Sequence, residues 1–584
     1  MHVLATAGHV DHGKSTLVRA LTGMEPDRWA EERRRGMTLD LGFAWTTLGS
    51  GQTVAFVDVP GHERFVPTML AGVGPVPAAL VVVAADEGWM PQSAEHLDAL
   101  DALGVTHGLL VVTRSDLLDP ELALADAREH LAGTGLADLT AVAVSATTGA
   151  GMAELRTALG VLVDGLPTPD TTADVRLWVD RSFTVRGAGT VVTGTLAAGT
   201  LRVGDELELA GRRVGVRGLQ SLGRTETEVA AVARVAVNVR GVGVDDVPRG
   251  TALLTPGRWR STDTVDVRVR PVRGDELELP THGVLHVGAA AAPARVRPLG
   301  ADTARLTLDH PLPLRIGDRA VLRDSGARRV VGGLVVLDPA PPSLRRRGAP
   351  AARAVVLSGV DEHPDGAAEL ARRGVVRAEH LRALGAAVPV DAPSEAGWLV
   401  DPALLEPLRA RLSAAVRAHA RAHPLDPGLP VEAARRALDL PDARLLTLVS
   451  RGFTVREGRV HAAGTTVGLP PAVEAALGTL LAELVLAPFA APDAPRLAAL
   501  GLGARELAAA GRAGRLLKVA DGVWLAPDAL TRAVDVLGSL EQPFTPAGAR
   551  EALRSSRRVV VPLLELLAVR GLTARHEDGT HSLG

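Results

Sequence analysis

The first twenty residues restrict the fold of this chain more than any other stretch. An apolar run at residues 2–7 (HVLATA) predicts a buried strand, and it leads directly into GHVDHGKS at residues 8–15. This octapeptide fits G-x-x-x-x-G-K-[ST], a loop whose backbone amides surround phosphates while its lysine reaches the terminal oxygens. Residues 15–21 predict a helix whose N-terminus faces the same phosphates. The sequence therefore predicts a strand, loop and helix that bind a nucleotide.

The lysine of this loop, Lys14, is unusual for this chain. Of the 64 lysine and arginine residues, only two are lysines. A slender ammonium on a flexible stem fits inside a phosphate-binding loop, whereas a planar guanidinium does not. The retention of lysine at this position supports the nucleotide-binding interpretation.

Length and charge set the broad class. A chain of 584 residues exceeds one hydrophobic core and predicts several domains. The net charge of −3 gives no sign of nucleic-acid binding by the whole chain, so any RNA contact must be local. There is no cysteine, no signal-peptide pattern and no apolar run long enough to span a membrane. We expect a soluble, cytoplasmic, multidomain protein with no membrane partner.

Two further patterns follow the loop and could complete a phosphate site. The first is RGMT at residues 35–38, in which Thr38 can offer its hydroxyl to Mg²⁺ and its amide to a γ-phosphate. The second is DVPGHE at residues 58–63, which ends a predicted strand. There, Asp58 can orient the Mg²⁺ shell, and Gly61 can bring its amide close to the γ-phosphate without a Cβ clash. His62 would then stand beside the attacking water.

Two later strand ends predict a guanine site. Residues 108–112 lead into TRSD, where the carboxylate of Asp116 can accept two hydrogen bonds from guanine. Adenine lacks that pair of donors and would leave the carboxylate unpaired. Residues 141–144 lead into Ser145 and Ala146, whose backbone amides can meet guanine O6.

Each pattern alone is more often a turn or a surface residue. Their fixed order, mostly at the ends of predicted strands, is what favours a functional interpretation. Strands that alternate with helices predict a parallel, doubly wound sheet with its ligand at the carboxyl ends of the strands.

Residues 8–16, 35–38 and 58–63 resemble the translational GTPases of the elongation factor Tu class. The resemblance implies a P-loop GTPase domain over residues 1–168, with GTP and Mg²⁺ as ligands. It implies that His62, Lys14 and Thr38 are catalytic, and that Ser15, Thr38 and Asp58 bind the metal. The nucleotide-binding residues implied are Gly8, Asp11, His12, Gly13, Lys14, Ser15, Thr16, Gly61, Thr113, Arg114, Asp116, Ser145 and Ala146.

The guanine motif departs from the family pattern Asn-Lys-x-Asp, because Thr113 and Arg114 replace its first two residues. Arg114 can still lay its aliphatic stem on the base. Thr113 lacks the amide, so the motif predicts guanine preference and leaves the strength of nucleotide binding open. Threonine at this position also resembles one branch of the class, the selenocysteine-specific elongation factors.

After a proline-containing linker the periodicity changes to short β-branched runs separated by glycine. These runs predict two small β-barrels, over residues 172–257 and 260–340. Residues 180–194 (DRSFTVRGAGTVVTG) resemble the second-domain signature of the Tu class.

Within the selenocysteine branch, this resemblance places the aminoacyl pocket at Asp180, Arg181 and Arg234. Selenocysteine carries a selenolate at neutral pH, and arginines hold an anion better than they hold a neutral seryl hydroxyl. The alternative is that both arginines are ordinary surface cations with packed stems.

The chain continues past the second barrel through a proline-rich, basic linker at residues 341–352. Most of the remainder, residues 353–584, reads as short helices followed by two-strand hairpins, such as 504–525 and 557–581. Helix, helix and wing is the winged form of helix-turn-helix, so we expect a C-terminal domain of tandem winged-helix modules.

This extension resembles the bacterial selenocysteine-specific factors, whose winged helices bind a hairpin in selenoprotein messenger RNA. The RNA-contact candidates in the last module are Arg550, Arg554, Ser556, Arg557 and Arg558. The alternative is a solvated helix face or a protein-docking module.

The function that the resemblance implies is delivery of selenocysteinyl-tRNA to the ribosome at recoded UGA codons. The protein would be a monomer, a ribosome-stimulated GTPase and a binder of the messenger hairpin. Two alternatives are another Tu-class GTPase, initiation-factor-like or sulfate-activating, with an unrelated C-terminal domain, and a nucleotide-gated DNA-binding regulator.

Overall fold

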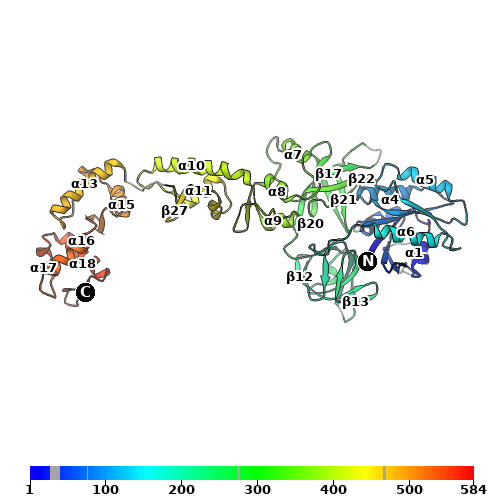
Figure 1. Ribbon diagram of the computed structural model, residues 1–584, viewed down its shortest axis with the longest axis horizontal. Helices are drawn as coiled ribbons and strands as arrows, with labels where there is room; N and C mark the ends of the chain where they lie inside the picture. The colour runs from blue at the N-terminus through cyan, green and yellow to red at the C-terminus, as the bar shows by residue number, and fades with distance from the viewer. Residues whose placement is uncertain are drawn as a thin grey trace. The chain divides into compact units, whose positions relative to one another are not determined.

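The computed structural model describes residues 1–26, 40–74, 76–187, 189–272, 276–324, 326–327, 329–463 and 469–584. The chain divides into two compact units (Figure 1), one of residues 1–372 with 376–390 and one of residues 373–375 with 391–584. The predicted Thr38 site lies outside the described residues. No helix among those described is long and apolar enough to cross a membrane.

The first unit begins with a six-stranded sheet in the order β2-β3-β1-β4-β5-β6, parallel except for β2. Its central strand β4 (Ala78–Ala84) is buried along its whole length, as expected for a parallel sheet covered on both faces. The remaining elements are β1 (His2–Ala7), α1 (Lys14–Thr22), β2 (Gly42–Thr47), β3 (Thr53–Asp58), η1 (Glu63–Phe65), α3 (Val66–Val73), α4 (Pro91–Ala102), β5 (His107–Thr113), α5 (Glu121–Leu131), β6 (Thr140–Ala143) and α6 (Met152–Asp164).

The first barrel is a ring of strands in the order β11-β16-β7-β9-β15-β12, which closes because β11 also pairs with β12. Alternate residues of β15 are buried, so one face of that strand lines the core. The strands of this domain are β7 (Arg176–Trp178), β8 (Arg181–Val185), β9 (Gly189–Leu196), β10 (Thr200–Arg202), β11 (Glu206–Leu209), β12 (Arg212–Ser221), β13 (Arg224–Glu226), β14 (Glu228–Ala230), β15 (Ala233–Arg240) and β16 (Ala252–Leu254).

The second barrel closes in the order β17-β20-β19-β18-β21-β22. The prediction of a P-loop GTPase domain followed by two barrels is confirmed. The strands of this barrel are β17 (Ser261–Pro271), β18 (His282–Val287), β19 (Ala290–Pro298), β20 (Thr303–Pro313), β21 (Arg319–Asp324) and β22 (Arg329–Asp338).

Helix α7 (Ala349–Ser358) is fastened to the second barrel by buried charges. Arg353 donates from Nε to Asp266 at 2.7 Å and from Nη2 to Asp338 at 2.6 Å. Arg305 of β20 donates to both oxygens of the same Asp266, at 2.6 and 2.9 Å. Removing one member of such a network leaves an uncompensated buried charge. The chain therefore stays attached to the barrel after it leaves β22.

The rest of the chain repeats one arrangement of helices and a short antiparallel hairpin, which confirms the predicted C-terminal winged-helix domain. In the last repeat the helices α16, α17 and α18 precede β31 and β32. The bounds of the described helices and strands after α7 are α8 (Gly366–Arg373), β23 (Val375–Arg377), α9 (Ala378–Ala383), β24 (Ser394–Glu395), β25 (Trp398–Val400), α10 (Leu405–Ala422), β26 (Leu429–Pro430), α11 (Val431–Leu438), α12 (Leu446–Val449), β27 (Phe453–Arg456), β28 (Arg459–Ala462), α13 (Pro471–Leu486), α14 (Ala494–Ala499), α15 (Ala504–Arg512), β29 (Leu517–Ala520), β30 (Val523–Leu525), α16 (Ala529–Leu537), α17 (Pro546–Ala552), α18 (Arg557–Val569), β31 (Thr573–Arg575) and β32 (His581–Leu583).

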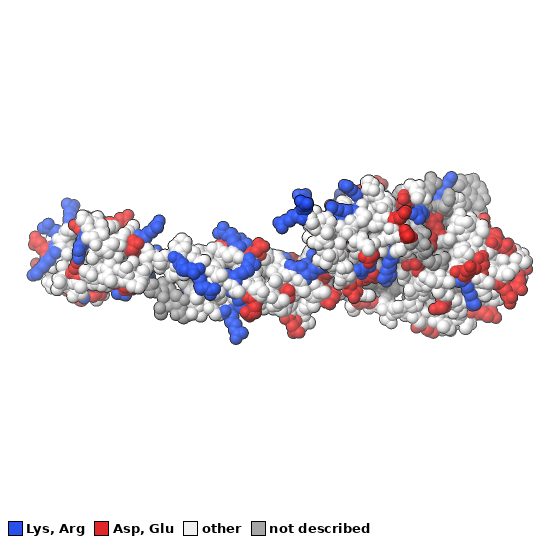
Figure 2. All heavy atoms as spheres, turned by 90° about the horizontal axis from the view of Figure 1, so that it is seen from above, with Lys and Arg blue, Asp and Glu red and all other residues white. Residues whose placement is uncertain are grey.

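Surface charge agrees with a protein that makes local contacts. On the face seen in Figure 2, acidic side chains gather over the GTPase domain, and basic side chains are scattered along the C-terminal elements. No broad field of one sign covers that face, in keeping with the net charge of −3.

Candidate functional site

The phosphate loop has the backbone geometry that its sequence predicts. Gly8 has a φ of 136°, and a β-carbon there would lie 2.2 Å from the Val82 carbonyl oxygen, so this position requires glycine. Helix α1 begins at Lys14, which is 6% exposed and donates from Nζ to the carbonyls of Gly8 at 3.0 Å and His9 at 2.6 Å. Burial lowers the pKa of Lys14 to about 8. The ammonium thus lies inside the loop, where phosphate oxygens would neutralise it.

Oxygen ligands suited to a metal ion meet beside this lysine. Asp58 is fully buried at the end of β3, and burial raises the pKa of its carboxyl. It accepts hydrogen bonds from Ser15 Oγ at 2.6 Å and from Thr6 Oγ1 at 2.7 Å. Carboxylate and hydroxyl oxygens are suitable ligands for Mg²⁺. In such sites a few protein groups hold the ion together with phosphates and water. The predicted pair Ser15 and Asp58 fits that ion.

Gly61 lies against the phosphate loop. A β-carbon at this position would stand 2.5 Å from the Val10 amide nitrogen and 2.6 Å from Lys14 Nζ. Only glycine allows this approach, as the sequence predicts for a backbone that contacts a γ-phosphate. His62 follows with a partly exposed ring, whose Nδ1 accepts a hydrogen bond from the Arg64 amide at 3.2 Å.

Thr113, which replaces the asparagine of the family motif, contacts the phosphate loop directly. Its hydroxyl donates to the His12 carbonyl of the phosphate loop at 2.7 Å. Its side chain is buried, and Gly13 packs against it. The substitution therefore keeps a direct connection between β5 and the phosphate loop.

The neighbouring Arg114 crosses toward the same loop. Its Nη1 donates to Asp86 at 2.9 Å and to Glu87 at 2.8 Å, and its Nη2 donates to the Asp11 carbonyl. Partial burial lowers the pKa of Arg114, but the hydrogen bonds to Glu87 and Asp86 together outweigh this effect and raise the pKa above its ordinary value. The guanidinium thus reinforces the loop, and only its stem is free to lie along a base.

The remaining residues predicted to bind guanine lie at the carboxyl ends of β5 and β6. Asp116 is exposed, while the adjacent Ser115 amide donates to the Val144 carbonyl at 3.2 Å. Ser145 is buried, and its Oγ accepts a hydrogen bond from the Thr148 amide at 3.1 Å. The two predicted loops are therefore held side by side.

Helix α4 contributes two contacts that sequence reasoning missed. His96 Nδ1 accepts a hydrogen bond from the Gly8 amide at 3.0 Å, and Gln92 Oε1 accepts one from the Val10 amide at 3.1 Å. Burial lowers the pKa of His96 to about 3, so the ring stays neutral and able to accept. The sequence signal that could have indicated this pair is the spacing of Gln92 and His96 by one helical turn, which places both side chains on one face of the helix.

The predicted aminoacyl residues Asp180 and Arg234 form a bidentate ion pair in the first barrel. Arg234 Nη2 donates to Asp180 Oδ1 at 2.7 Å, and its Nη1 donates to the other oxygen. Thr193 Oγ1 donates to the same carboxylate at 2.8 Å. The Arg234 guanidinium also lies 3.8 Å from the ring centroid of Phe43 in β2, a cation–π contact with the GTPase domain.

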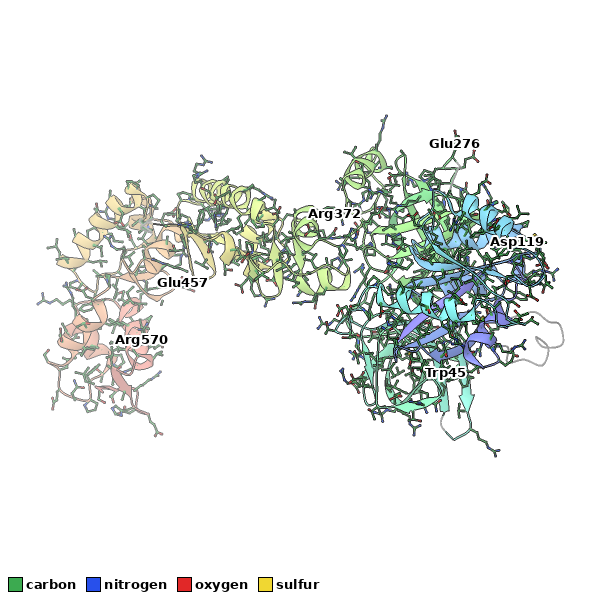
Figure 3. All side chains as sticks on the ribbon, turned by 45° about the vertical axis from the view of Figure 1, so that its right-hand side comes forward. Trp45, Asp119, Glu276, Arg372, Glu457 and Arg570 are labelled. Carbon is green, nitrogen blue, oxygen red and sulfur yellow. The ribbon has the colours of Figure 1, made fainter. Side chains whose placement is uncertain are left out.

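Arg181 lies at the same junction and is held by the GTPase domain. Its Nη2 donates to Asp40 Oδ2 at 2.7 Å and makes a longer contact of 3.4 Å to the Leu41 carbonyl. Arg249 approaches the other Asp40 oxygen at 3.7 Å. Nearby, Trp45 of β2 (Figure 3) lies against Gly223 of the first barrel. All three predicted pocket residues are thus on the side of the barrel that meets β2.

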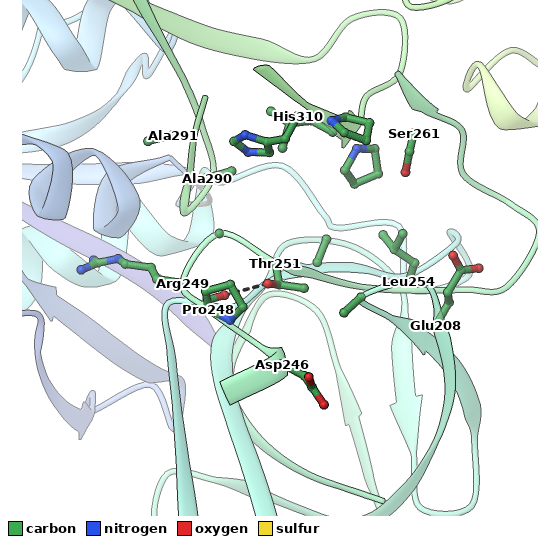
Figure 4. A pocket seen from close by; sticks show the side chains of 17 residues that line it. Glu208, Asp246, Pro248, Arg249, Thr251, Leu254, Ser261, Ala290, Ala291 and His310 are labelled. Carbon is green, nitrogen blue, oxygen red and sulfur yellow. Dashed lines mark hydrogen bonds between the residues drawn. The ribbon is translucent and has the colours of Figure 1, made fainter. Parts of the chain in front are cut away.

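A separate pocket of 670 Å³ lies between the two barrels (Figure 4). Thr251, drawn there with a dashed line, donates from Oγ1 to the Pro248 carbonyl at 2.7 Å. None of the residues predicted for a functional site lines this pocket.

The RNA-contact candidates of the last module are all exposed: Arg550, Arg554, Ser556, Arg557 and Arg558. Ser556 is the N-cap residue of α18. Arg558 differs from the other arginines in that its Nη2 donates to the Pro492 carbonyl at 3.1 Å.

Four family models match consecutive parts of the chain. They describe an elongation factor Tu GTP binding domain over residues 1–165 and an elongation factor Tu domain 2 over 189–254. They also describe a selenocysteine-specific elongation factor beta-barrel domain over 266–343 and an elongation factor SelB winged helix over 535–581.

Curated relatives support the same assignment. A selenocysteine-specific elongation factor of Desulfomicrobium baculatum is 38% identical over 360 residues, covering 59% of this chain and 57% of the relative. That of Escherichia coli is 39% identical over 364 residues, covering 59% and 56%. The chain thus spans somewhat more than half the length of these relatives. A translation initiation factor 2 subunit gamma of Thermococcus kodakarensis is 32% identical, covering 56% of this chain and 95% of the relative.

Solved structures share the fold. A crystal structure of a bacterial selenocysteine-specific elongation factor superimposes with a TM-score of 0.75 and 24% identity, covering 100% of both chains. The Methanococcus maripaludis factor SelB, in complex with a GTP analogue, gives a TM-score of 0.53 over 58% of this chain and 79% of that chain.

Proposed function

Because the chain belongs to the translational GTPases of the elongation factor Tu class, in the selenocysteine-specific branch, we propose that it delivers selenocysteinyl-tRNA to the ribosome at recoded UGA codons. The observation that carries the proposal is the junction at which Arg181 contacts Asp40 of the GTPase domain and Arg234, paired with Asp180, contacts Phe43 of β2. A cargo pocket in contact with the nucleotide-binding domain is what a GTP-dependent carrier needs.

GTP binding is assigned to the loop and strand ends described above. Asp116 selects guanine, Lys14 neutralises the β and γ phosphates, and the amides of the loop surround them. Ser15, Asp58 and Thr38 would hold Mg²⁺, which neutralises phosphate charge when it is bound. His62 places the attacking water once the ribosome is engaged.

The cargo is selected by charge. The selenol of selenocysteine is a much stronger acid than the seryl hydroxyl, so only the former is an anion at neutral pH. Arg181 and Arg234 are oriented by Asp40 and Asp180, which hold each guanidinium in place without neutralising the whole cluster, because Arg249 adds a third cation. An anionic side chain would neutralise the remaining positive charge of this cluster, whereas a neutral one would not.

The C-terminal domain is assigned to the messenger hairpin. Arg550, Arg554, Arg557 and Arg558 provide exposed cations beside Ser556. Phosphate contacts would position the hairpin, and an unpaired loop base would be read by hydrogen bonds. In this proposal the protein acts as a monomer on ribosomes of the cytoplasm.

The decisive experiment is a protection assay. Purified protein with GTP is mixed with selenocysteinyl-tRNA, and the rate of ester hydrolysis is measured with the seryl form of the same tRNA as competitor. We expect slow hydrolysis of the selenocysteinyl ester and little protection of the seryl ester. Equal or absent protection would contradict the proposal and would favour another Tu-class GTPase.

A further inference from the structure

The segment between β4 and α4 carries two adjacent carboxylates, Asp86 and Glu87, that belong to none of the predicted motifs. Both lie against Arg114, the second residue of the guanine motif. Arg114 Nη1 lies 2.9 Å from Asp86 Oδ2 and 2.8 Å from Glu87 Oε1. The other terminal nitrogen, Nη2, donates to the Asp11 carbonyl of the phosphate loop. One guanidinium therefore has two anchors on the segment between β4 and α4 and a third on the phosphate loop.

An acidic pair is unexpected so close to a site for an anionic nucleotide. Carboxylates repel phosphate groups, so Asp86 and Glu87 by themselves would weaken nucleotide binding. Arg114 offers one positive charge against their two negative charges, so it does not neutralise the pair. The contacts with Arg114 must therefore contribute something other than neutralisation.

The backbone that carries the two carboxylates is fixed at both ends. On one side, the Ala85 amide donates to the Thr113 carbonyl of β5 at 2.9 Å. On the other side, the Trp89 amide donates to Asp126 of α5 at 2.8 Å, and the Trp89 ring stacks on His130 with ring centroids 4.9 Å apart. The carboxylates are therefore held in place before a nucleotide binds, which lowers the entropic cost of orienting Arg114.

Arg114 itself is held in a conformation that its backbone does not favour. Its φ is 57°, a left-handed value that residues with a β-carbon rarely adopt and that persists only where the surroundings impose it. The side chain starts just after the end of β5 and finishes at the phosphate loop. Its aliphatic stem must therefore span the space between the guanine motif and the phosphate loop, where a bound base would lie.

Glu87 also reaches the phosphate loop through its second oxygen. Glu87 Oε2 lies 3.5 Å from Nε2 of His12, a side chain with no exposed surface. The carbonyl of the same His12 accepts the hydrogen bond from Thr113 Oγ1. Glu87 thus contacts one residue of the guanine motif and one residue of the phosphate loop.

We propose that Asp86 and Glu87 are positioning residues for guanine: they hold the Arg114 guanidinium so that its stem forms one face of the base site. The proposal rests on the proposed function, because it requires a guanine nucleotide at this site. Both carboxylates act through Arg114 and need no contact with the nucleotide. Isolated surface ion pairs contribute little, but here two carboxylates and a backbone carbonyl share one guanidinium, which restricts its rotamers.

The test is a double-mutant cycle in the full-length chain, made of Glu87→Gln, Arg114→Ala and the two together. The rate at which fluorescent GDP dissociates is measured for each protein. We expect Glu87→Gln to release GDP about three- to tenfold faster, the loss of one partly exposed charge-assisted hydrogen bond. Arg114→Ala should release GDP at least as fast. Adding Glu87→Gln to Arg114→Ala should change nothing further, because the carboxylate acts through the guanidinium.

The matched control is Glu129→Gln, which removes an exposed carboxylate of α5 and should release GDP at the wild-type rate. Glu87→Gln also alters the contact with His12, so the cycle is repeated with Asp86→Asn, whose printed partner is Arg114 alone among the described residues. Asp86→Asn should show the same dependence on Arg114. All of these variants should keep the wild-type unfolding temperature.

Three outcomes would overturn the proposal. They are wild-type GDP release by both Glu87→Gln and Asp86→Asn, additive effects in both cycles, and faster release that is matched by a lower unfolding temperature in both carboxylate variants. A wild-type protein that does not bind GDP would remove the guanine site, and this proposal with it. A wild type that binds GDP but does not protect selenocysteinyl-tRNA would remove only the proposed cargo, and the cycle would still decide the role of the two carboxylates.

Discussion

Arg181 of the first barrel donates a hydrogen bond to the carboxylate of Asp40 in the GTPase domain, at 2.7 Å. Asp40 immediately precedes the Leu41 that leads into β2, and Phe43 in that strand lies under Arg234. The two arginines proposed to hold the cargo are therefore both in contact with one short segment of the nucleotide-binding domain. A carboxylate and an anionic cargo would compete for the same guanidinium.

This competition predicts the effect of Asp40→Asn. Without the carboxylate, Arg181 is freed for the selenolate, and we expect selenocysteinyl-tRNA to bind about tenfold more tightly, the gain typical of one charge-assisted hydrogen bond. Seryl-tRNA affinity should not change, because a neutral hydroxyl gains little from a free cation. Ester protection with both tRNAs measures the two affinities. Asp40→Glu keeps the charge and should bind selenocysteinyl-tRNA as the wild type does. Tighter binding by Asp40→Glu, or no gain in affinity in Asp40→Asn, would exclude competition.

A second prediction concerns the hydrogen bond that the Thr113 hydroxyl donates. Thr113→Val keeps the shape of the side chain but removes its hydrogen bond to the His12 carbonyl. An unsatisfied buried carbonyl costs about 1 to 3 kcal/mol, so we expect guanine nucleotides to dissociate about tenfold faster. Fluorescent GDP release measures the rate. Thr113→Ser, which retains the hydroxyl, serves as the control, and equal release rates in all three proteins would show that the bond does not hold the loop.

Sequence reasoning predicted the phosphate loop, Asp58 and Gly61 because their roles depend on local spacing and on strand ends. It did not find His96 or Gln92, since these act through a helix that tertiary packing brings to the Gly8 and Val10 amides.

The proposed aminoacyl pocket shows the same limit of sequence reasoning. The sequence offered Arg181 from a family signature, but its partner Asp40 is 141 residues away. The position of Arg558 likewise depends on the carbonyls of a preceding module. Contacts between domains leave no periodicity for a sequence pattern to reveal.

Acid should weaken the fold through His96. Its pKa is lowered by burial to about 3, from an ordinary 6.5 in the unfolded chain. Between those values the unfolded state binds the extra proton, so stability falls as the pH falls, by up to about 1.4 kcal/mol per pH unit. His96→Gln can still accept from the Gly8 amide without titrating. Urea unfolding from pH 7 to pH 4 should therefore show a shallower decline for this variant, and parallel curves would rule out His96 as a source.

Substitutions of two neighbouring arginines in the last module, Arg557 and Arg558, should have different effects. Arg557 is exposed, so Arg557→Ala should weaken binding of the messenger hairpin, by about 1 kcal/mol or more for a phosphate contact, without changing thermal stability. Arg558 donates to the Pro492 carbonyl, so Arg558→Ala should also lower the unfolding temperature. Gel-shift titration and calorimetry distinguish the two. Hairpin affinity unchanged in both variants would remove these residues from the RNA site.

His62 stands next to Gly61, whose backbone touches the phosphate loop, yet its ring is only partly buried and bonds only to the Arg64 amide among the described residues. The side chain is therefore not needed to hold the loop. We expect His62→Ala to bind GTP as the wild type does. Its rate of ribosome-stimulated hydrolysis should fall by about 10²-fold to 10⁴-fold, the range for a misplaced proton acceptor or water-positioning group. Single-turnover phosphate release with programmed ribosomes measures this loss, and nucleotide affinity measured in parallel confirms an intact site. A stimulated rate close to that of the wild type would assign the positioning of water to another residue.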